Sequence, residues 1–166
     1  MAVHESDGGF TRDRVLTAVV AVVLVNVVGA LPALLAGPDS AWFGSLAKPA
    51  LYPPPWAFGV VWTALFTLLG IAVALVYLAG AGRREVRVAL AAFAGQMVLN
   101  VAWTPTFFAA QNLLAGLVVI TALWPAVLVT VLAFDRVDRR AALLLLPYLA
   151  WVTFAAVLNF QFWQLN

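Results

Sequence analysis

Residues 88–134 read VALAAFAGQMVLNVAWTPTFFAAQNLLAGLVVITALWPAVLVTVLAF, and none of these 47 side chains carries a charge. A helix rises about 1.5 Å per residue, so roughly 20 apolar residues span the ~30 Å hydrocarbon core of a bilayer. The run is more than twice that length and must cross a membrane twice. The break is expected over residues 104–112, where a proline and carboxamides interrupt the aliphatic sequence.

The rest of the 166-residue chain has the same character, because 65% of all residues are hydrophobic and only 10% are charged. Soluble proteins hold roughly 45–50% apolar and about 25% charged residues, so the composition indicates an integral membrane protein. The alternating pattern of a membrane β-barrel is absent. The sequence therefore predicts an all-α fold, a bundle of five transmembrane helices near Val15–Ala36, Trp56–Ala79, Val88–Phe108, Asn112–Phe134 and Ala141–Trp163.

No linker, low-complexity tract or soluble domain interrupts these helices. We therefore expect one domain over residues 12–166, after a short, loose, polar tail at residues 1–11. The first helix could be mistaken for a cleaved signal peptide. Its apolar core exceeds the roughly 7–15 residues usual for such a signal, so we treat it as a retained helix.

The cations are divided unequally between the two sides of the predicted bundle. Lys48 is alone on one side, and cytoplasmic loops are generally enriched in Lys and Arg, so the division predicts a cytoplasmic N-terminus and an external C-terminus. Orientation also accounts for the pI near 9.5, without nucleic acid as a partner. The cations of the other side are Arg12, Arg14, Arg83, Arg84, Arg87, Arg136, Arg139 and Arg140.

Few residues in this chain belong to the types that usually carry chemistry. There is no cysteine, and the one histidine, His4, lies in the tail, so we expect no metal site and no catalytic residues. No ionisable side chain of the kind that couples transport to protons is expected inside a helix. Neutral amides and aromatic rings are the candidate functional groups.

Two of the predicted helices place amide and aromatic side chains on one face, at i, i+4 and i+7 or closely similar spacings. Such carboxamides often only join helices, each contributing about 0.6–2 kcal/mol, and a combined structural and ligand-binding role is the alternative. The small Ala155 leaves either a close helix contact or space beside Trp151. The two sets are Gln96, Asn100 and Trp103 in the third helix, and Tyr148, Trp151, Ala155 and Asn159 in the fifth.

The seven tryptophans gather away from the predicted arginine side. An ordinary aromatic belt occupies both membrane interfaces. The one-sided distribution favours an aromatic-walled cavity that opens on the side opposite the arginines, with a skewed belt as the alternative. Flat apolar ligands would suit such a cavity. Trp42, Trp56, Trp103 and Trp163 are expected at that end, Trp62 in the adjoining half of the bilayer, and Trp124 and Trp151 near its middle.

The loop before the second helix reads KPALYPPPWAFGVVW over residues 48–62. Pro53, Pro54 and Pro55 fix φ and lack amide hydrogens, so they predict a stiff extended approach whose last member can occupy the first helical turn. Lys48 either extends to lipid headgroups or meets a carboxylate on an amphipathic ligand.

Four groups of residues occur in an informative order: Lys48-Pro49 through Pro53-Pro54 to Trp56-Ala57-Phe58-Gly59 and Trp62; Gly95-Gln96 with Leu99-Asn100 and Trp103; Pro105 with Phe107-Phe108; and Pro147-Tyr148-Leu149-Ala150-Trp151 with Phe154-Ala155 and Leu158-Asn159. Together they resemble the TspO/MBR family, the tryptophan-rich sensory proteins whose animal members are called translocator protein or peripheral benzodiazepine receptor. The resemblance covers nearly the whole chain.

The resemblance implies a five-helix bundle, usually dimeric, that binds porphyrins such as protoporphyrin IX and haem as ligands, with no obligatory cofactor. Some members also bind cholesterol and drug-like molecules. The family's pocket lies between helices under the first long loop. By matched position, the expected ligand-binding residues are Trp42, Lys48, Pro49, Trp56, Trp62, Gln96, Asn100, Trp103, Tyr148, Trp151, Ala155 and Asn159.

The chain departs from the animal members at the end of the fifth helix. Their cholesterol-recognition pattern needs a tyrosine followed by a basic residue, whereas residues 158–164 read LNFQFWQ, so we expect no sterol site of that kind. The animal mitochondrial setting does not transfer either, because no Arg- and Ser-rich transit segment is visible, and we expect a bacterial cell membrane.

Small residues predict where two copies of the chain meet. Ala91 and Gly95 have the small-xxx-small spacing that lets helix backbones approach closely, so we expect a homodimer through the third helix. Gly29 and Ala33 in the first helix offer a rival face.

Three functions fit the sequence. The first is a membrane porphyrin-binding protein that acts as sensor, scavenger or translocator. The second is light- and oxygen-dependent porphyrin breakdown, as the resemblance suggests, although no acid–base pair or nucleophile supports ordinary catalysis. The third is an uncoupled carrier of small molecules or a membrane adaptor.

Overall fold

The computed structural model describes residues 6–166, and side chains from Thr11 onward. The expectation for His4 lies outside the described residues. The elements are α1 (Ser6–Leu35), α2 (Ala41–Ser45), α3 (Pro55–Leu78), α4 (Arg84–Thr104), the π-helical turn η1 (Pro105–Ala109), α5 (Leu113–Asp135) and α6 (Arg139–Leu165). Within this part of the chain five helices are long and apolar enough to cross a membrane, which confirms the predicted all-α membrane fold.

The helix boundaries differ from the predicted ones mainly at two places. Helix α1 begins at Ser6, so residues 6–11 are helical, where the sequence predicted a loose tail. The third span begins at Arg84 and its last turn is the π-helical η1, in which the Ala110 amide bonds to the Pro105 carbonyl at 2.9 Å. Proline lacks an amide hydrogen, so the regular α-helical ladder is broken there.

The bend between α4 and α5 is compact. Gln111 has a φ of 53°, a left-handed backbone conformation that non-glycine residues rarely adopt. Asn112 then caps α5, because its side-chain oxygen accepts a hydrogen bond from the Ala115 amide at 2.9 Å. The proline and the carboxamides of the predicted break therefore end one helix and start the next.

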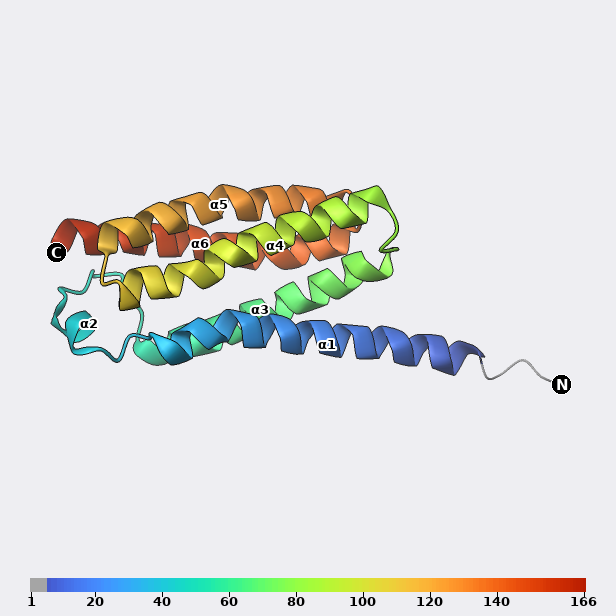
Figure 1. The fold of residues 1–166 in the computed structure, drawn as a ribbon, viewed down its shortest axis with the longest axis horizontal. Helices are drawn as coiled ribbons and strands as arrows, with labels where there is room; N and C mark the ends of the chain where they lie inside the picture. Colours follow the sequence, from blue (N-terminus) through green and yellow to red (C-terminus); the bar gives the residue numbers. More distant parts are fainter. Residues whose placement is uncertain (1–5) are drawn as a thin grey trace.

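The helices form two groups (Figure 1). Helix α1 lies along α3, and α4, α5 and α6 pack together on the other side. Glycine permits the close α1–α3 contact, since a Cβ added at Gly70 would lie 2.4 Å from the Cα of Val22. A Cβ added at Gly29 would lie 2.3 Å from the Phe66 ring. Phe66 of the same chain thus packs on Gly29, which argues against a dimer interface through Gly29 and Ala33.

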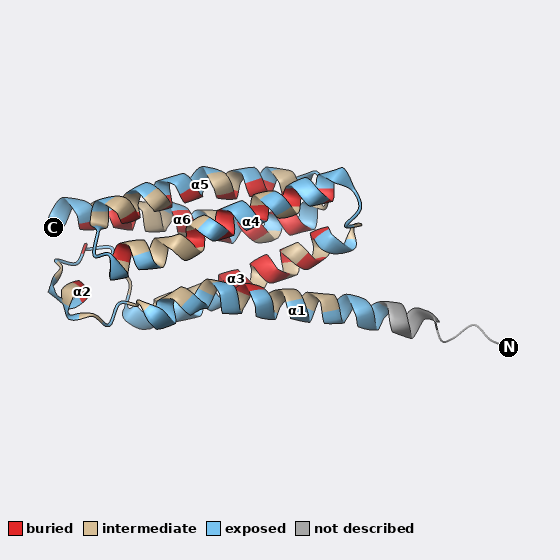
Figure 2. Ribbon diagram, in the orientation of Figure 1, coloured by how far each residue is buried: buried red, intermediate tan, exposed pale blue. Residues whose placement is uncertain are grey.

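The buried core lies among α3, α4, α5 and α6, whereas α1 is exposed over most of its surface (Figure 2). Leu69, Val86, Phe134 and Leu145 are fully buried in this core. Along α1 only Val25 is buried among the described residues. In a bilayer the aliphatic side chains of α1 therefore face lipid, which is as apolar as they are.

The two ends of the bundle differ in charge (Figure 1). One end, which we call the arginine end, holds the start of α1 and the connections α3–α4 and α5–α6, and so all the arginines. The opposite end, which we call the capped end, holds α2, the start of α3, the turn η1 and the end of α6. The predicted segregation of the arginines from Lys48 is confirmed.

Candidate ligand-binding site

An apolar cavity of about 350 Å³ lies between α1, α3, α4, α5 and α6 at the capped end of the bundle. Ligand pockets typically measure about 300–1,000 Å³, so this volume is at the lower end of that range. Aromatic and aliphatic side chains form most of its lining, and no Asp, Glu, Lys, Arg or His is among them. The cavity therefore suits a mainly apolar ligand that is oriented by a few neutral polar groups.

Half of the predicted ligand-binding residues lie in the cavity wall. They come from three different helices, and the helical spacing noted in the sequence places them on inward faces. They are Trp62 from α3, Asn100 and Trp103 from α4, and Trp151, Ala155 and Asn159 from α6.

Trp56 does not line the cavity, so its predicted role in ligand binding stays a prediction. It is 71% exposed, one residue after the start of α3. Its neighbours Pro55, Phe58 and Gly59 line the cavity instead. The matching sequence motif alone could not distinguish these neighbours.

Gln96 and Tyr148 lie behind the cavity wall and do not line it. Asn100 Nδ2 donates to the Tyr148 hydroxyl at 2.8 Å, and this hydroxyl donates to Gln96 Oε1 at 2.8 Å. Gln96 and Tyr148 are fully buried, and Gln96 Nε2 has no hydrogen-bond partner. These hydrogen bonds join α4 to α6, so Gln96 and Tyr148 have the helix-joining role.

Asn159 also joins helices. It accepts a hydrogen bond from the Trp103 indole nitrogen at 3.1 Å and donates to the Ala155 carbonyl at 2.8 Å. Because Trp103, Ala155 and Asn159 all line the cavity, this pair of bonds fixes one indole of the wall in place. Asn159 therefore both joins α4 to α6 and lines the cavity.

The indoles of the cavity wall pack against other rings. Trp62 stacks on Phe66, with ring centroids 5.2 Å apart, and meets Trp151 edge to face at 6.4 Å. Trp103 stacks on Phe107 at 5.2 Å. Offset and edge-to-face pairs each contribute about 0.5–1.5 kcal/mol beyond area burial, so the wall is well ordered before any ligand binds.

The loop with α2 closes the capped end through Phe43. This side chain is 5% exposed and contacts the rings of Phe107, Phe108 and Phe162. Trp42 also packs its ring edge on Phe107, with centroids 6.0 Å apart, so it braces the loop from outside the cavity. Trp42 does not line the cavity, so its predicted role in ligand binding stays a prediction.

The Lys48 side chain contacts Phe43 of its own loop. Its ammonium group donates to the Phe43 carbonyl and lies 3.7 Å from the centroid of the Phe43 ring, a cation–π contact. Partial burial lowers the pKa of Lys48 from its usual value. Pro49 is buried beneath the same loop, and its carbonyl accepts from the Tyr52 amide at 3.0 Å. Neither residue lines the cavity, and direct contact of either with a ligand stays a prediction.

Four polar lining residues were not predicted: Asn26, Tyr52, Thr63 and Thr104. Asn26 is the one carboxamide within the first predicted span, and this isolation was the available signal. Its Nδ2 donates to the Val22 carbonyl at 2.9 Å and to Thr67 Oγ1 at 3.3 Å. The two threonines sit among apolar neighbours and gave no comparable signal.

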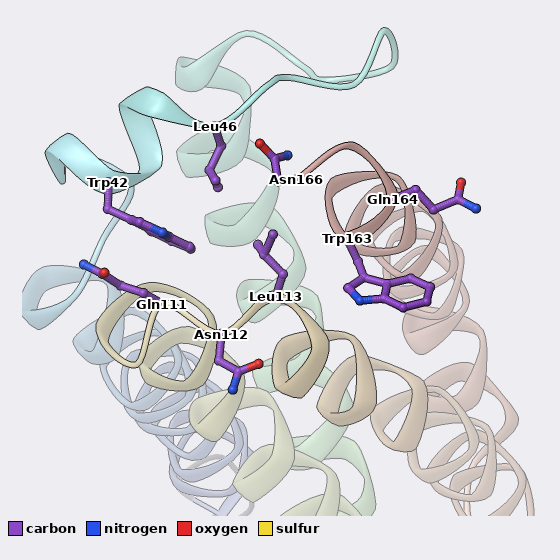
Figure 3. A pocket seen from close by; sticks show the side chains of 8 residues that line it. All are labelled: Trp42, Leu46, Gln111, Asn112, Leu113, Trp163, Gln164 and Asn166. Carbon is purple, nitrogen blue, oxygen red and sulfur yellow. The ribbon is translucent and has the colours of Figure 1, made fainter.

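A second hollow, of about 720 Å³, lies at the surface of the capped end (Figure 3). It is larger than the cavity but open, and five of its eight lining residues are exposed. An apolar ligand would lose little contact with water there, so the cavity is the better candidate for a binding site. At the edge of the hollow, Asn166 accepts from the Ala47 amide at 2.8 Å and donates to the Ala47 carbonyl at 3.2 Å.

Comparison with known proteins agrees with this architecture. The sequence matches the TspO/MBR family over residues 19–164. It is 43% identical to the tryptophan-rich protein TspO of Chlorobaculum tepidum, over 92% of this chain and 98% of that protein. It is 40% identical to the protein CrtK of Rhodobacter capsulatus, over 76% and 79% of the two chains. It is also 38% identical to the translocator protein of Ovis aries, over 75% of each. With five membrane-spanning helices and a family match over most of its length, this chain belongs to the TspO/MBR family.

Proposed function

We propose that this protein binds porphyrin-like tetrapyrroles within the membrane and acts as their sensor, scavenger or translocator. The observation that carries the proposal is an apolar, uncharged cavity walled by Trp62, Trp103 and Trp151. Flat apolar rings gain both area burial and favourable ring contacts in such a site. The names tryptophan-rich sensory protein and translocator protein, given to relatives, agree with sensing and movement of a ligand.

The polar groups support an amphipathic ligand of this kind. A macrocycle inserted edge-on would contact the indoles, while its propionate groups would extend toward the capped end. Lys48 is the cation of that end among the described residues, and its ammonium group, which donates to the Phe43 carbonyl, would use a second of its three hydrogens to bind a carboxylate. Binding by stacking and burial needs no axial ligand, so both protoporphyrin IX and haem are candidate ligands.

The orientation and the location belong to the same proposal. The arginine end would face the cytoplasm, since cations are enriched on that side of membrane proteins. The cavity and its cap would then lie toward the external side of a bacterial cell membrane, where ligand could be collected or released.

Replacing Trp151 with phenylalanine is expected to weaken protoporphyrin IX binding by about threefold, because a smaller ring loses part of the stacking contact. Saturable quenching of tryptophan fluorescence in detergent measures the midpoint. The matched control is Trp163→Phe, since Trp163 is exposed and does not line the cavity. Equal midpoints for wild type and Trp151→Phe, or a shift confined to Trp163→Phe, would contradict the assigned cavity.

We further propose a homodimer through α4. Ala91 and Gly95 are both exposed on this helix, and a Cβ added at Gly95 would meet no atom within 4 Å. The face is therefore smooth and free for a second copy to approach closely. Because the chain has no cysteine, Ala91→Cys introduces a single thiol.

We expect the Ala91→Cys protein to form a disulfide-linked dimer for most of the material on mild oxidation in membranes. Ala150→Cys, on the exposed face of α6, serves as the control and should couple poorly. Poor coupling at Ala91 together with efficient coupling at Ala150 would move the interface to α6.

A further inference from the structure

We propose that the ligand reaches the cavity sideways from the lipid, through an opening beside α1 and the first turns of α3, while the α2 cap stays closed. This inference rests on the proposed function and concerns the route to the same site. All lining residues contributed by α4, η1, α5 and α6 are buried or half-buried. The exposed lining residues all lie on the other side of the cavity and are Ala30, Ala33, Pro38, Pro55, Gly59 and Thr63.

The opening lies at the depth of the hydrocarbon core. Thr63 is eight residues beyond the start of α3 at Pro55, which is about 12 Å along the helix axis. Ala30 is five residues before the end of α1 at Leu35, or about 7.5 Å. Side chains at these depths face acyl chains of the leaflet next to the capped end, and a molecule dissolved in that leaflet can meet the opening directly.

The chemistry of the opening suits contact with lipid. Ala30, Ala33 and Gly59 offer no polar side chain, and the Thr63 hydroxyl donates to the Gly59 carbonyl at 2.8 Å within its own helix. No polar side chain of these four residues is thus left without a hydrogen bond. These four residues are also small, so their own side chains take up little of the opening.

The water-facing route is closed by several contacts that would have to break together. Phe43 is nearly buried among the rings of Tyr52, Phe107 and Phe162. Lys48 holds the Phe43 carbonyl, and Asn166 holds both backbone groups of Ala47. Figure 3 shows Asn166 beside Leu46, at the edge where the loop meets the end of α6. Lifting this cap would expose aromatic surface to water, whereas the lateral route leaves it in place.

The inference can be tested by partly closing the opening and, separately, by locking the cap. Gly59→Leu narrows the opening, and it should fold because a Cβ at Gly59 meets no atom within 4 Å. Thr63→Met is a second narrowing variant, and Ala122→Leu on the exposed face of α5 is the control. Ala47→Cys/Asn166→Cys, bridged by a short thiol crosslinker, locks the cap, and the same protein without the crosslinker is its reference.

Each protein is reconstituted in phosphatidylcholine vesicles and mixed rapidly with protoporphyrin IX, and quenching is followed in time. Protein-free vesicles give the rate of partitioning into lipid. We expect Gly59→Leu and Thr63→Met to slow association by about tenfold and to slow dissociation as well. Both residues also line the cavity, so loss of room alone would raise the midpoint and speed dissociation, and slower dissociation therefore identifies a narrowed route. Ala122→Leu and the locked cap should leave the rates unchanged.

The opposite pattern, in which the crosslinked cap stops binding and the narrowed variants associate at the wild-type rate, would overturn the lateral route while leaving the proposed function intact. Absence of saturable binding to the wild-type protein would refute both. Midpoints measured at equilibrium therefore report on the function, and the rates report on the route.

Discussion

Ala155→Leu is expected to weaken protoporphyrin IX binding by about thirtyfold or more. Ala155 lines the cavity on α6, close in sequence to Trp151 and Asn159, which also line it. Adding three carbon atoms to the wall of a cavity of about 350 Å³ leaves less room for a rigid ring. Forcing extra methylene groups into a filled site costs about 1–3 kcal/mol, and about 2 kcal/mol corresponds to thirtyfold in affinity.

The matched control for this variant is Ala150→Leu. The substitution and the helix are the same, but Ala150 is exposed and does not line the cavity. Equilibrium quenching of tryptophan fluorescence gives both midpoints, and thermal unfolding in the same detergent shows whether each variant is folded. A folded Ala155→Leu protein with the wild-type midpoint would show that the ligand occupies another place.

Tyr148→Phe is expected to lower the free energy of unfolding by about 1–3 kcal/mol. The hydroxyl accepts from Asn100 and donates to Gln96 in a fully buried position between α4 and α6. Its removal leaves the Gln96 oxygen and the Asn100 amide without their partner, and buried polar groups without partners are costly. The ring itself is retained, so packing changes little.

Tyr77→Phe provides the control for the loss of a hydroxyl, since Tyr77 is 50% exposed on α3. Thermal unfolding midpoints and denaturant titrations in one detergent should show a clear loss for Tyr148→Phe and almost none for Tyr77→Phe. Because Tyr148 lies behind the cavity wall, Tyr148→Phe should change the porphyrin-binding midpoint less than it changes the stability of the protein. A large loss of affinity with unchanged stability would mean that Tyr148 contacts the ligand.

The contrast between Ala155 and Tyr148 shows how far helical spacing leads. Both residues were predicted to share one face of the fifth helix with Trp151 and Asn159. These residues do share one face of α6, but that face is wide enough to contact both the cavity and α4. Ala155 lines the cavity. Tyr148 contacts α4, where its hydroxyl group forms hydrogen bonds with Gln96 and Asn100. Spacing identifies a face, and only packing decides what covers each part of it.

The loop before α3 illustrates the same limit. The sequence indicated a stiff, positioned segment, and Pro55 does begin α3. The sequence also suggested that Lys48 and Trp56 meet a ligand directly. In the structure the Lys48 ammonium is held by Phe43 of the same loop, and Trp56 is directed outward. A lysine without a nearby acidic partner in sequence can still find a carbonyl and a ring once the chain folds back on itself.

The amino-acid sequence alone determined that this is a membrane protein with five spanning helices, arginines at one end and aromatic rings toward the other. These features depend on composition and on distances along a helix, which are local properties of the chain. The tertiary structure decided which side chains enclose the cavity, because that depends on the rotation of each helix about its axis. It also decided that small lining residues of α1 and α3 are exposed, since a glycine in a close contact and an exposed glycine look the same in a sequence.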